Sequence, residues 1–181
     1  MRHITREARV NLAAVNYYLG DKESLYLEVV RSRLQAVNRE RLARLAEAER
    51  EAAGEPVALA LLLGILAGPL FELHLDPRGG SHGARLIGRL LGEPLPFMEK
   101  FLAEELQPVL ARFAQAIRRH VPTLPPEEFL WRFSFVVGAM HHAAATLHRM
   151  HALTRGICRD DDHAAALARF VPLGARALRE S

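Results

Sequence analysis

Hydrophobic residues recur at helical spacing along almost the whole chain. One stripe comprises Phe97, Phe101, Val109, Phe113 and Ile117, and a second comprises Phe129, Phe133, Val136, Val137, Met140, Ala144 and Leu147. Such stripes are typical of helices that bury one face against neighbouring helices. Alternating runs rich in Val, Ile and Thr between hairpin turns are absent, so strands are not expected. The pattern predicts an all-α fold.

Turn and capping residues divide this pattern into separate helices. Gly20-Asp21 combines a helix stop with an N-cap, Gly54 and Pro56 separate two helices, and Pro122 to Pro126 separates two more. Residues 76–81 are expected to form a loop. The predicted helices span residues 3–8, 11–19, 22–52, 56–75, 82–92, 95–120, 126–152 and 162–179.

The most apolar run, Pro56 to Leu73, is interrupted by Gly64, Gly68 and Pro69. It is too short and too broken for a membrane span. We expect a buried helix with a kink or break near Gly68-Pro69, and no membrane association.

Charge and cysteine content narrow the class of protein further. The net charge is +3, and residues 1–50 hold ten Lys and Arg against seven Asp and Glu, whereas the rest of the chain is balanced. A basic bias confined to one end suits a module that meets phosphate. Cys158 is the only cysteine, which excludes an internal disulfide and a zinc site built on several cysteines. No signal peptide opens the chain, so a cytoplasmic location is expected.

Residues 8–26 carry the most specific motif, with the sequence ARVNLAAVNYYLGDKESLY. It resembles the TetR family signature of Ala-Gly-Val, a short helix ending in Tyr-His-Phe or Tyr-Tyr-Phe, and Gly-Ser-Lys-Glu-x-Leu. The resemblance implies a TetR-like fold. Residues 1–30 would form a partial helix-turn-helix DNA-binding module, and residues 31–181 a helical effector-binding and dimerisation domain.

The matching positions imply contacts to a palindromic double-stranded DNA operator. Small and polar side chains can approach base edges in the major groove, whereas tyrosine hydroxyls and a lysine at a helix start suit phosphates. Arg9 replaces the usual glycine of the turn, where it either strains the backbone or binds a phosphate. The tyrosines alternatively pack the short helix against the next one. The predicted DNA-binding residues are Arg9, Asn11, Ala14, Asn16, Tyr17, Tyr18 and Lys22.

The chain departs from the family at its start, because only Met1 to Ala8 precede the motif. The family has a full first helix there, which braces the recognition helix. Either the recorded start lies downstream of the true one, which the intact recognition helix favours, or the chain is a truncated dimeric small-molecule-binding protein without effective DNA binding.

Residues 84–150 resemble a TetR subgroup that includes repressors released by long-chain fatty acids or their thioesters. The likeness rests on residues 85–91, 124–132 and 135–139. Large apolar side chains with a few cations or imidazoles suit an amphiphile with an anionic head. Each residue taken singly is better explained as core. The predicted ligand-binding residues are Phe71, His74, Leu86, Arg89, Phe101, Phe113, Phe135, Met140 and His141.

TetR relatives form homodimers through their two closing helices, and a twofold dimer presents two recognition helices to two half-sites. The apolar stripes here alternatively pack within one chain. The predicted dimer residues are Phe133, Val137, Ala144, Leu147, Phe170 and Leu173.

Catalytic and metal sites are not expected. His141, His148 and His151 lie near one helix face but lack further ligands at suitable spacing. Cys158 lies beside Arg155 and Arg159, which could activate it, although an incidental loop cysteine is the simpler interpretation. No phosphate loop, nucleophile elbow or His-Glu-x-x-His motif is present. The sequence therefore predicts a non-enzymatic, ligand-responsive repressor without a cofactor.

Overall fold

The structure, a computed structural model, describes residue 7 and residues 22–73, 96–146, 149–157 and 163–179. Within these ranges the regular structure is helical, which confirms the all-α prediction. The described elements are α3 (Lys22–Glu51), α4 (Leu59–Glu72), α6 (Pro96–Glu105), α7 (Gln107–Arg118), α8 (Pro126–Thr146), α9 (Met150–Leu153) and α10 (His163–Arg179). The helices expected over 11–19 and 82–92, and all of 3–8 except residue 7, lie outside the described residues.

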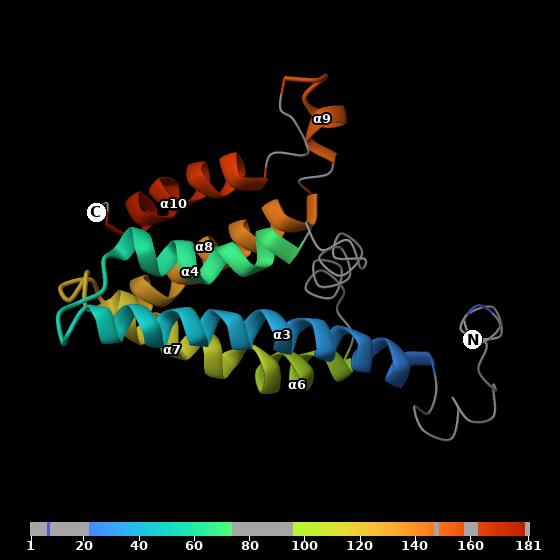
Figure 1. The fold of residues 1–181 in the computed structure, drawn as a ribbon, viewed down its shortest axis with the longest axis horizontal. Coiled ribbons are helices and arrows are strands. Elements are labelled where there is room, and N and C mark those ends of the chain that lie inside the picture. The colour runs from blue at the N-terminus through green and yellow to red at the C-terminus, as the bar shows by residue number, and fades with distance from the viewer. Residues whose placement is uncertain (1–6, 8–21, 74–95, 147–148, 158–162, 180–181) are drawn as a thin grey trace.

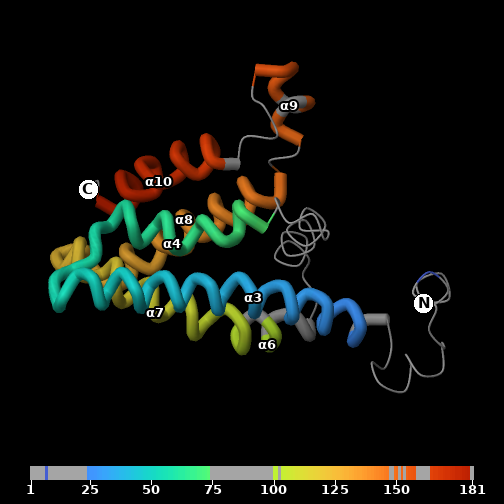
Figure 2. Tube along the Cα trace, in the orientation of Figure 1, coloured from blue at the N-terminus to red at the C-terminus, as the bar shows by residue number. Residues whose placement is uncertain are grey.

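The helices form a bundle around α4, which packs against α3, α7, α8 and α10. In Figure 1, α4 lies between α3 and α10, while α6 and α7 run along the other side of α3. The tube in Figure 2 shows that α3 begins at the opposite end of the bundle from the last turn of α10. Among the described residues, no helix is both long and apolar enough to cross a membrane.

Helix α3 is the longest element, with 30 residues and a length of about 45 Å. Its buried apolar positions lie three, four or eight residues apart, on one face of the helix, at Val30, Leu34, Val37, Leu45 and Ala48. The helix ends where Ala53 and Gly54 adopt positive φ values of 50° and 97°. Glycine adopts this conformation without a steric penalty, so the predicted break at Gly54 follows from the sequence.

Helix α4 is the core of the bundle, and ten of its 14 residues are buried. It continues through Gly68 and Pro69 to Glu72. A kink or a break was expected there, and the break does not occur. Proline lacks a backbone N–H and would leave a carbonyl one turn earlier without its helical donor. This turn nevertheless stays helical and is buried, from Gly68 to Phe71.

The helix expected over residues 95–120 is in fact two helices. α6 ends at Glu105 and α7 begins at Gln107, with Pro108 in its first turn. Proline disfavours helical geometry in the residue before it, whereas it fits the start of a new helix, so the single long helix was a wrong prediction.

The predicted helix over 126–152 also ends early, at Thr146, and a short helical turn follows at α9. α8 carries aromatic residues on two sides. Phe129 and Phe133 stack inside the bundle with ring centroids 5.9 Å apart, whereas Trp131 and Phe135 form a tilted pair outside at 5.8 Å. α10 begins within one residue of its predicted start and packs against α4 and α8.

Candidate functional site

Arg41 is a fully buried cation in the middle of the bundle, with 0% of its surface exposed. It occupies a position of the buried stripe of α3, between Val37 and Leu45. Its Nε donates a hydrogen bond of 2.7 Å to the carbonyl of Leu66 in α4, and its Nη1 donates one of 3.1 Å to Oδ1 of Asn38. No carboxylate pairs with it among the described residues, and burial lowers its pKa to about 10.

Three of the five Arg41 N–H groups have no oxygen acceptor in the described part of the chain. A guanidinium carries five N–H groups, and beyond the two bonds above the only further contact is from Nη2 to the sulfur of Met140 at 3.8 Å. Thioether sulfur is a weak acceptor. Burying a charge without an opposite charge costs free energy, so an anion bound at this position would be stabilising.

His141 lies beside Arg41 and is 6% exposed. Its Nδ1 lies 2.8 Å from the carbonyl of Val137, which can only accept, so Nδ1 carries the proton and Nε2 is the bare acceptor. Nε2 is buried without a hydrogen-bond partner among the described residues. Burial, and next the positive charge of Arg41, lower the pKa of His141 to about 4, so the imidazole is neutral at neutral pH.

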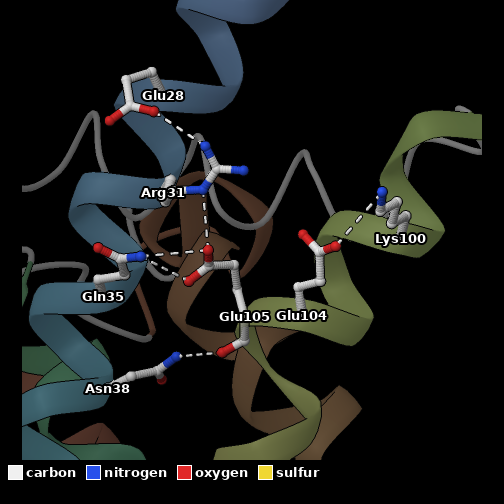
Figure 3. A network of polar contacts seen from close by, with 7 residues as sticks. All are labelled: Glu28, Arg31, Gln35, Asn38, Lys100, Glu104 and Glu105. Atoms are coloured by element: carbon white, nitrogen blue, oxygen red, sulfur yellow. Dashed lines mark hydrogen bonds and ion pairs between the residues drawn. The ribbon is translucent and has the colours of Figure 1, made fainter.

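A polar network joins this region to the end of α6 (Figure 3). Glu105 accepts hydrogen bonds from Arg31 Nε at 3.0 Å and from Gln35 Nε2 at 3.1 Å, and its backbone carbonyl accepts one from Asn38 at 2.8 Å. Arg31 also contacts Glu28 one turn earlier. Asn38 thus connects Glu105 to Arg41, and hydrogen bonds join α3 to α6 over about two turns.

Arg44, one turn after Arg41 on α3, forms a second connection. Its Nη1 and Nη2 donate to the two carboxylate oxygens of Glu72 at 2.9 and 2.7 Å, in a bidentate arrangement. A Cβ on Gly68 would lie 3.3 Å from Nη1 of Arg44, so the glycine leaves room for this pair. The hydrogen bond to Arg44 lowers the pKa of Glu72. α3 is therefore fixed to the last turn of α4.

An open apolar groove of about 610 Å³ lies between α6–α7 and α8. One wall comprises Ala103, Leu106, Gln107, Leu110, Ala111 and Ala114, and the other comprises Leu130, Phe133, Ser134 and Val137. We call it the α7–α8 groove. Among the described residues, only Gln107 and Ser134 add polar side chains to its lining. A groove of this size and composition suits the apolar part of a small molecule.

Comparison with known families identifies the chain. Residues 65–175, more than half of its length, match a family described as "Tetracyclin repressor-like, C-terminal domain". The chain belongs to the TetR family of transcriptional regulators. A search of curated proteins found no match. The matched range runs from α4 into α10 and includes His141 and the α7–α8 groove.

The residues predicted to bind DNA lie almost entirely outside the described part of this TetR protein. Arg9, Asn11, Ala14, Asn16, Tyr17 and Tyr18 all lie outside the described residues. Lys22 is the first residue of α3, and only its backbone is described. These assignments stay predictions.

Among the predicted ligand residues, Phe71, Phe101, Phe113, Met140 and His141 are buried in the bundle. Met140 and His141 lie at Arg41, whereas His74, Leu86 and Arg89 lie outside the described residues. Phe135 is 66% exposed and points away from the core, so its placement in an internal pocket was wrong. Because α8 carries apolar residues on several sides, the sequence pattern does not indicate which of them face the core.

The predicted dimer residues also fall into buried, exposed and undescribed positions. Phe133 and Ala144 are buried within the protomer, so they do not form an outer surface as expected. Val137 lines the α7–α8 groove, and Phe170 packs near Phe71 with ring centroids 6.3 Å apart. Leu173 is 57% exposed, and Leu147 is outside the described residues. The exposed apolar residues of α8 are instead Leu130, Trp131 and Phe135.

Sequence analysis missed Arg41 and Asn38. A signal was present, because Arg41 continues a buried apolar stripe with the spacing of Val37 and Leu45. A charged residue in such a stripe is either paired or functional. In the described residues, no group of three His, Cys, Asp or Glu side chains is placed to hold a metal ion.

The neutral state of His141 predicts a loss of stability in acid. Its folded-state pKa lies below the ordinary 6.5, so below that pH the unfolded chain takes up a proton that the folded chain resists until about pH 4. Between pH 6.5 and about pH 5 this costs about 2 kcal/mol. His141→Gln should flatten this part of the pH dependence of urea unfolding. His142→Gln, at the exposed neighbouring position, is the control; equal curves for both variants would contradict the assignment.

Proposed function

We propose that the protein is a ligand-responsive repressor that binds a palindromic operator as a homodimer. An amphiphilic effector with an anionic head, such as a fatty acid or its thioester, binds the helical domain and lowers operator affinity. The observation that carries this proposal is the continuity of α3. One helix runs from Lys22, at the edge of the predicted DNA-binding residues, to Arg41 in the core.

Continuity matters because a ligand shifts an equilibrium only through contacts that differ between two states. Arg41 and Arg44 fix α3 to α4, and Asn38 joins it to α6. A ligand that changes these bonds changes the preferred tilt of α3. The tilt in turn sets the separation of the two DNA-binding modules in a dimer, which is a coupling between two distinct sites.

The exposed side chains of α8 and α10 support the dimer. Trp131 and Phe135 on α8 and Leu173 on α10 are each more than half exposed. Aromatic residues are enriched at the centre of protein interfaces. We therefore place the homodimer contact on the outer sides of these two helices, with Phe135 and Trp131 as its main apolar contacts.

Lys22→Ala should weaken operator binding by roughly three- to tenfold at low salt, through loss of one phosphate contact. The slope of log affinity against log salt should fall by about 1, with no change in sequence preference. Fluorescence anisotropy with labelled promoter DNA measures both quantities. Lys100→Ala on α6 is the control, because this lysine is 83% exposed and contacts only Glu104 among the described residues. Equal affinity of the two variants would contradict the placement of Lys22 at the DNA.

Release of the promoter DNA by a ligand tests the repressor proposal itself. The same promoter DNA should bind the wild-type protein, and an acyl ligand should lower that affinity in a saturable manner. Specific DNA binding that no amphiphile alters would contradict the effector class, whereas absence of DNA binding would contradict the repressor.

A further inference from the structure

We propose that the α7–α8 groove receives the Trp131–Phe135 pair of a second copy of this chain, and that the groove of the second copy receives the same pair in return. The inference rests on the homodimer of the proposed function. It goes further because it adds α7 to the contact, beyond the outer sides of α8 and α10, and because it names the side chains that meet.

The outer side of α8 beside the groove carries no charge. The structure describes the stretch 130–139 in full, and Arg132 is its one charged residue. The Arg132 side chain is only 18% exposed and bonds Glu128 one turn earlier. Helix surfaces that face solvent usually carry charged residues, whereas charge is depleted at the centre of protein interfaces. The exposed residues of this stretch are Leu130, Trp131, Ser134, Phe135, Gly138 and Ala139. The outer side of α8 thus has the composition of an interface centre.

The groove continues this uncharged surface onto α7. Leu130 and Ser134 belong to both parts, because each of them is exposed and also lines the groove. Trp131 and Phe135 directly follow them in the chain, so they lie about 100° further around the helix. Among the described residues, the opposite wall has no charged side chain, and Gln107 is its one polar member. A ridge of two aromatic rings therefore stands next to an apolar hollow on one continuous surface.

The combination of ridge and hollow points to a second copy as the occupant. In a twofold dimer the same surface faces itself, so each protruding group needs a matching hollow on that surface. The rings of Trp131 and Phe135 form one ridge, with centroids 5.8 Å apart. Small side chains line the facing wall at Ala103, Ala111 and Ala114 and leave room for rings. A small molecule in the groove would cover the hollow but leave the ridge in water.

The area that a stable dimer buries supports the same occupant. The large apolar side chains on the outer sides of α8 and α10 are each more than half exposed, namely Leu130, Trp131, Phe135 and Leu173. At about 200 Å² for a whole large side chain, they expose on the order of 500 Å² together. A standard interface buries about 800 Å² on each partner. The outer sides of α8 and α10 alone fall short of this area, and the adjoining groove adds apolar area from α7.

Cross-linking between cysteines on two chains tests the contact directly. Two coexpressed chains with different tags carry Ala111→Cys and Phe135→Cys, and both also carry Cys158→Ser, which removes the native cysteine. A short bismaleimide should give a product that contains both tags. Leu61→Cys in place of Phe135→Cys is the control and should give no such product, because Leu61 is a similarly exposed apolar residue on α4.

Filling the groove is a second test, and it leaves the aromatic pair intact. Ala111→Trp should raise the dissociation constant of the dimer about tenfold or more, because the new ring occupies the space that the partner's rings need. Ala46→Trp on α3 is the matched control, since this alanine is also exposed but lies outside the groove. Sedimentation of the whole protein without DNA measures both constants, and the control should stay within about twofold of the wild type.

The outcomes separate this proposal from the homodimer itself. A dimer that gives no mixed cross-link, or that Ala111→Trp leaves unchanged, would overturn the proposal and leave the homodimer in place. If Ala111→Trp abolished binding of decanoate while the dimer persisted, the groove would belong to a small molecule, which also overturns it. A wild-type protein that stays monomeric at high micromolar concentration would overturn both.

Discussion

The double variant Phe135→Glu, Leu173→Glu is expected to be monomeric at micromolar concentration and to bind operator DNA at least about 100-fold more weakly than the wild type. Phe135 is 66% and Leu173 57% exposed, on two helices that pack side by side. Placing two carboxylates in an apolar interface forces the burial of unpaired charge, which costs several kcal/mol. A monomer also engages only one half-site of a palindrome.

Sedimentation and anisotropy on the same samples measure the two effects. Because both positions are exposed, the folded protomer should keep its melting temperature in the dilute, monomeric limit. Leu61→Glu is the control, since Leu61 is a similarly exposed apolar residue at 49% but lies on α4. If the double variant still formed a dimer, the interface would lie elsewhere than on α8 and α10.

Phe71→Ala is expected to lower the free energy of unfolding by about 3–5 kcal/mol. Phe71 is 1% exposed on α4, the helix that contacts most of the bundle, and its ring packs near Phe170. Truncation removes the buried ring and leaves a cavity among α3, α4 and α10. For a chain of this size the melting temperature should fall by roughly 6–20 °C.

Leu61→Ala provides the comparison on the same helix. Its side chain is half exposed, so its loss should change stability by less than about 1 kcal/mol. Urea denaturation of both variants separates the two cases. A Phe71→Ala protein as stable as Leu61→Ala would mean that Phe71 borders an empty space already, which favours its predicted role in lining a ligand pocket.

The ends of α3 and α10 followed from sequence because local chemistry specifies them. Gly54 stops one helix, and the acidic residues before His163 can cap the other. The separation of α6 from α7 did not follow from periodicity. Phe101, Val109 and Phe113 stay in helical phase across it, so their spacing is the same with or without a break. Pro108 was the local signal.

The candidate site was harder to predict because it depends on tertiary contacts. Met140 and His141 were identified from the stripe on α8, but nothing in that stripe indicates which helix faces them. Arg41 meets them from 99 positions away along the chain. The aromatic residues on opposite sides of α8 were hard to predict for the same reason. Composition alone does not indicate that Phe133 is buried and Phe135 exposed.

The length of α3 has a mechanical consequence. If the helix pivots as a rigid rod at Glu51, Arg41 lies about 15 Å from the pivot and Lys22 about 44 Å, at 1.5 Å per residue. A sideways shift of about 1 Å at Arg41 therefore becomes a shift of roughly 3 Å at Lys22. A phosphate hydrogen bond is lost over a smaller distance than that. On the proposed function, the buried arginine lies one third of the way along α3 from the pivot, so a small displacement caused by a ligand would become about three times larger at the DNA.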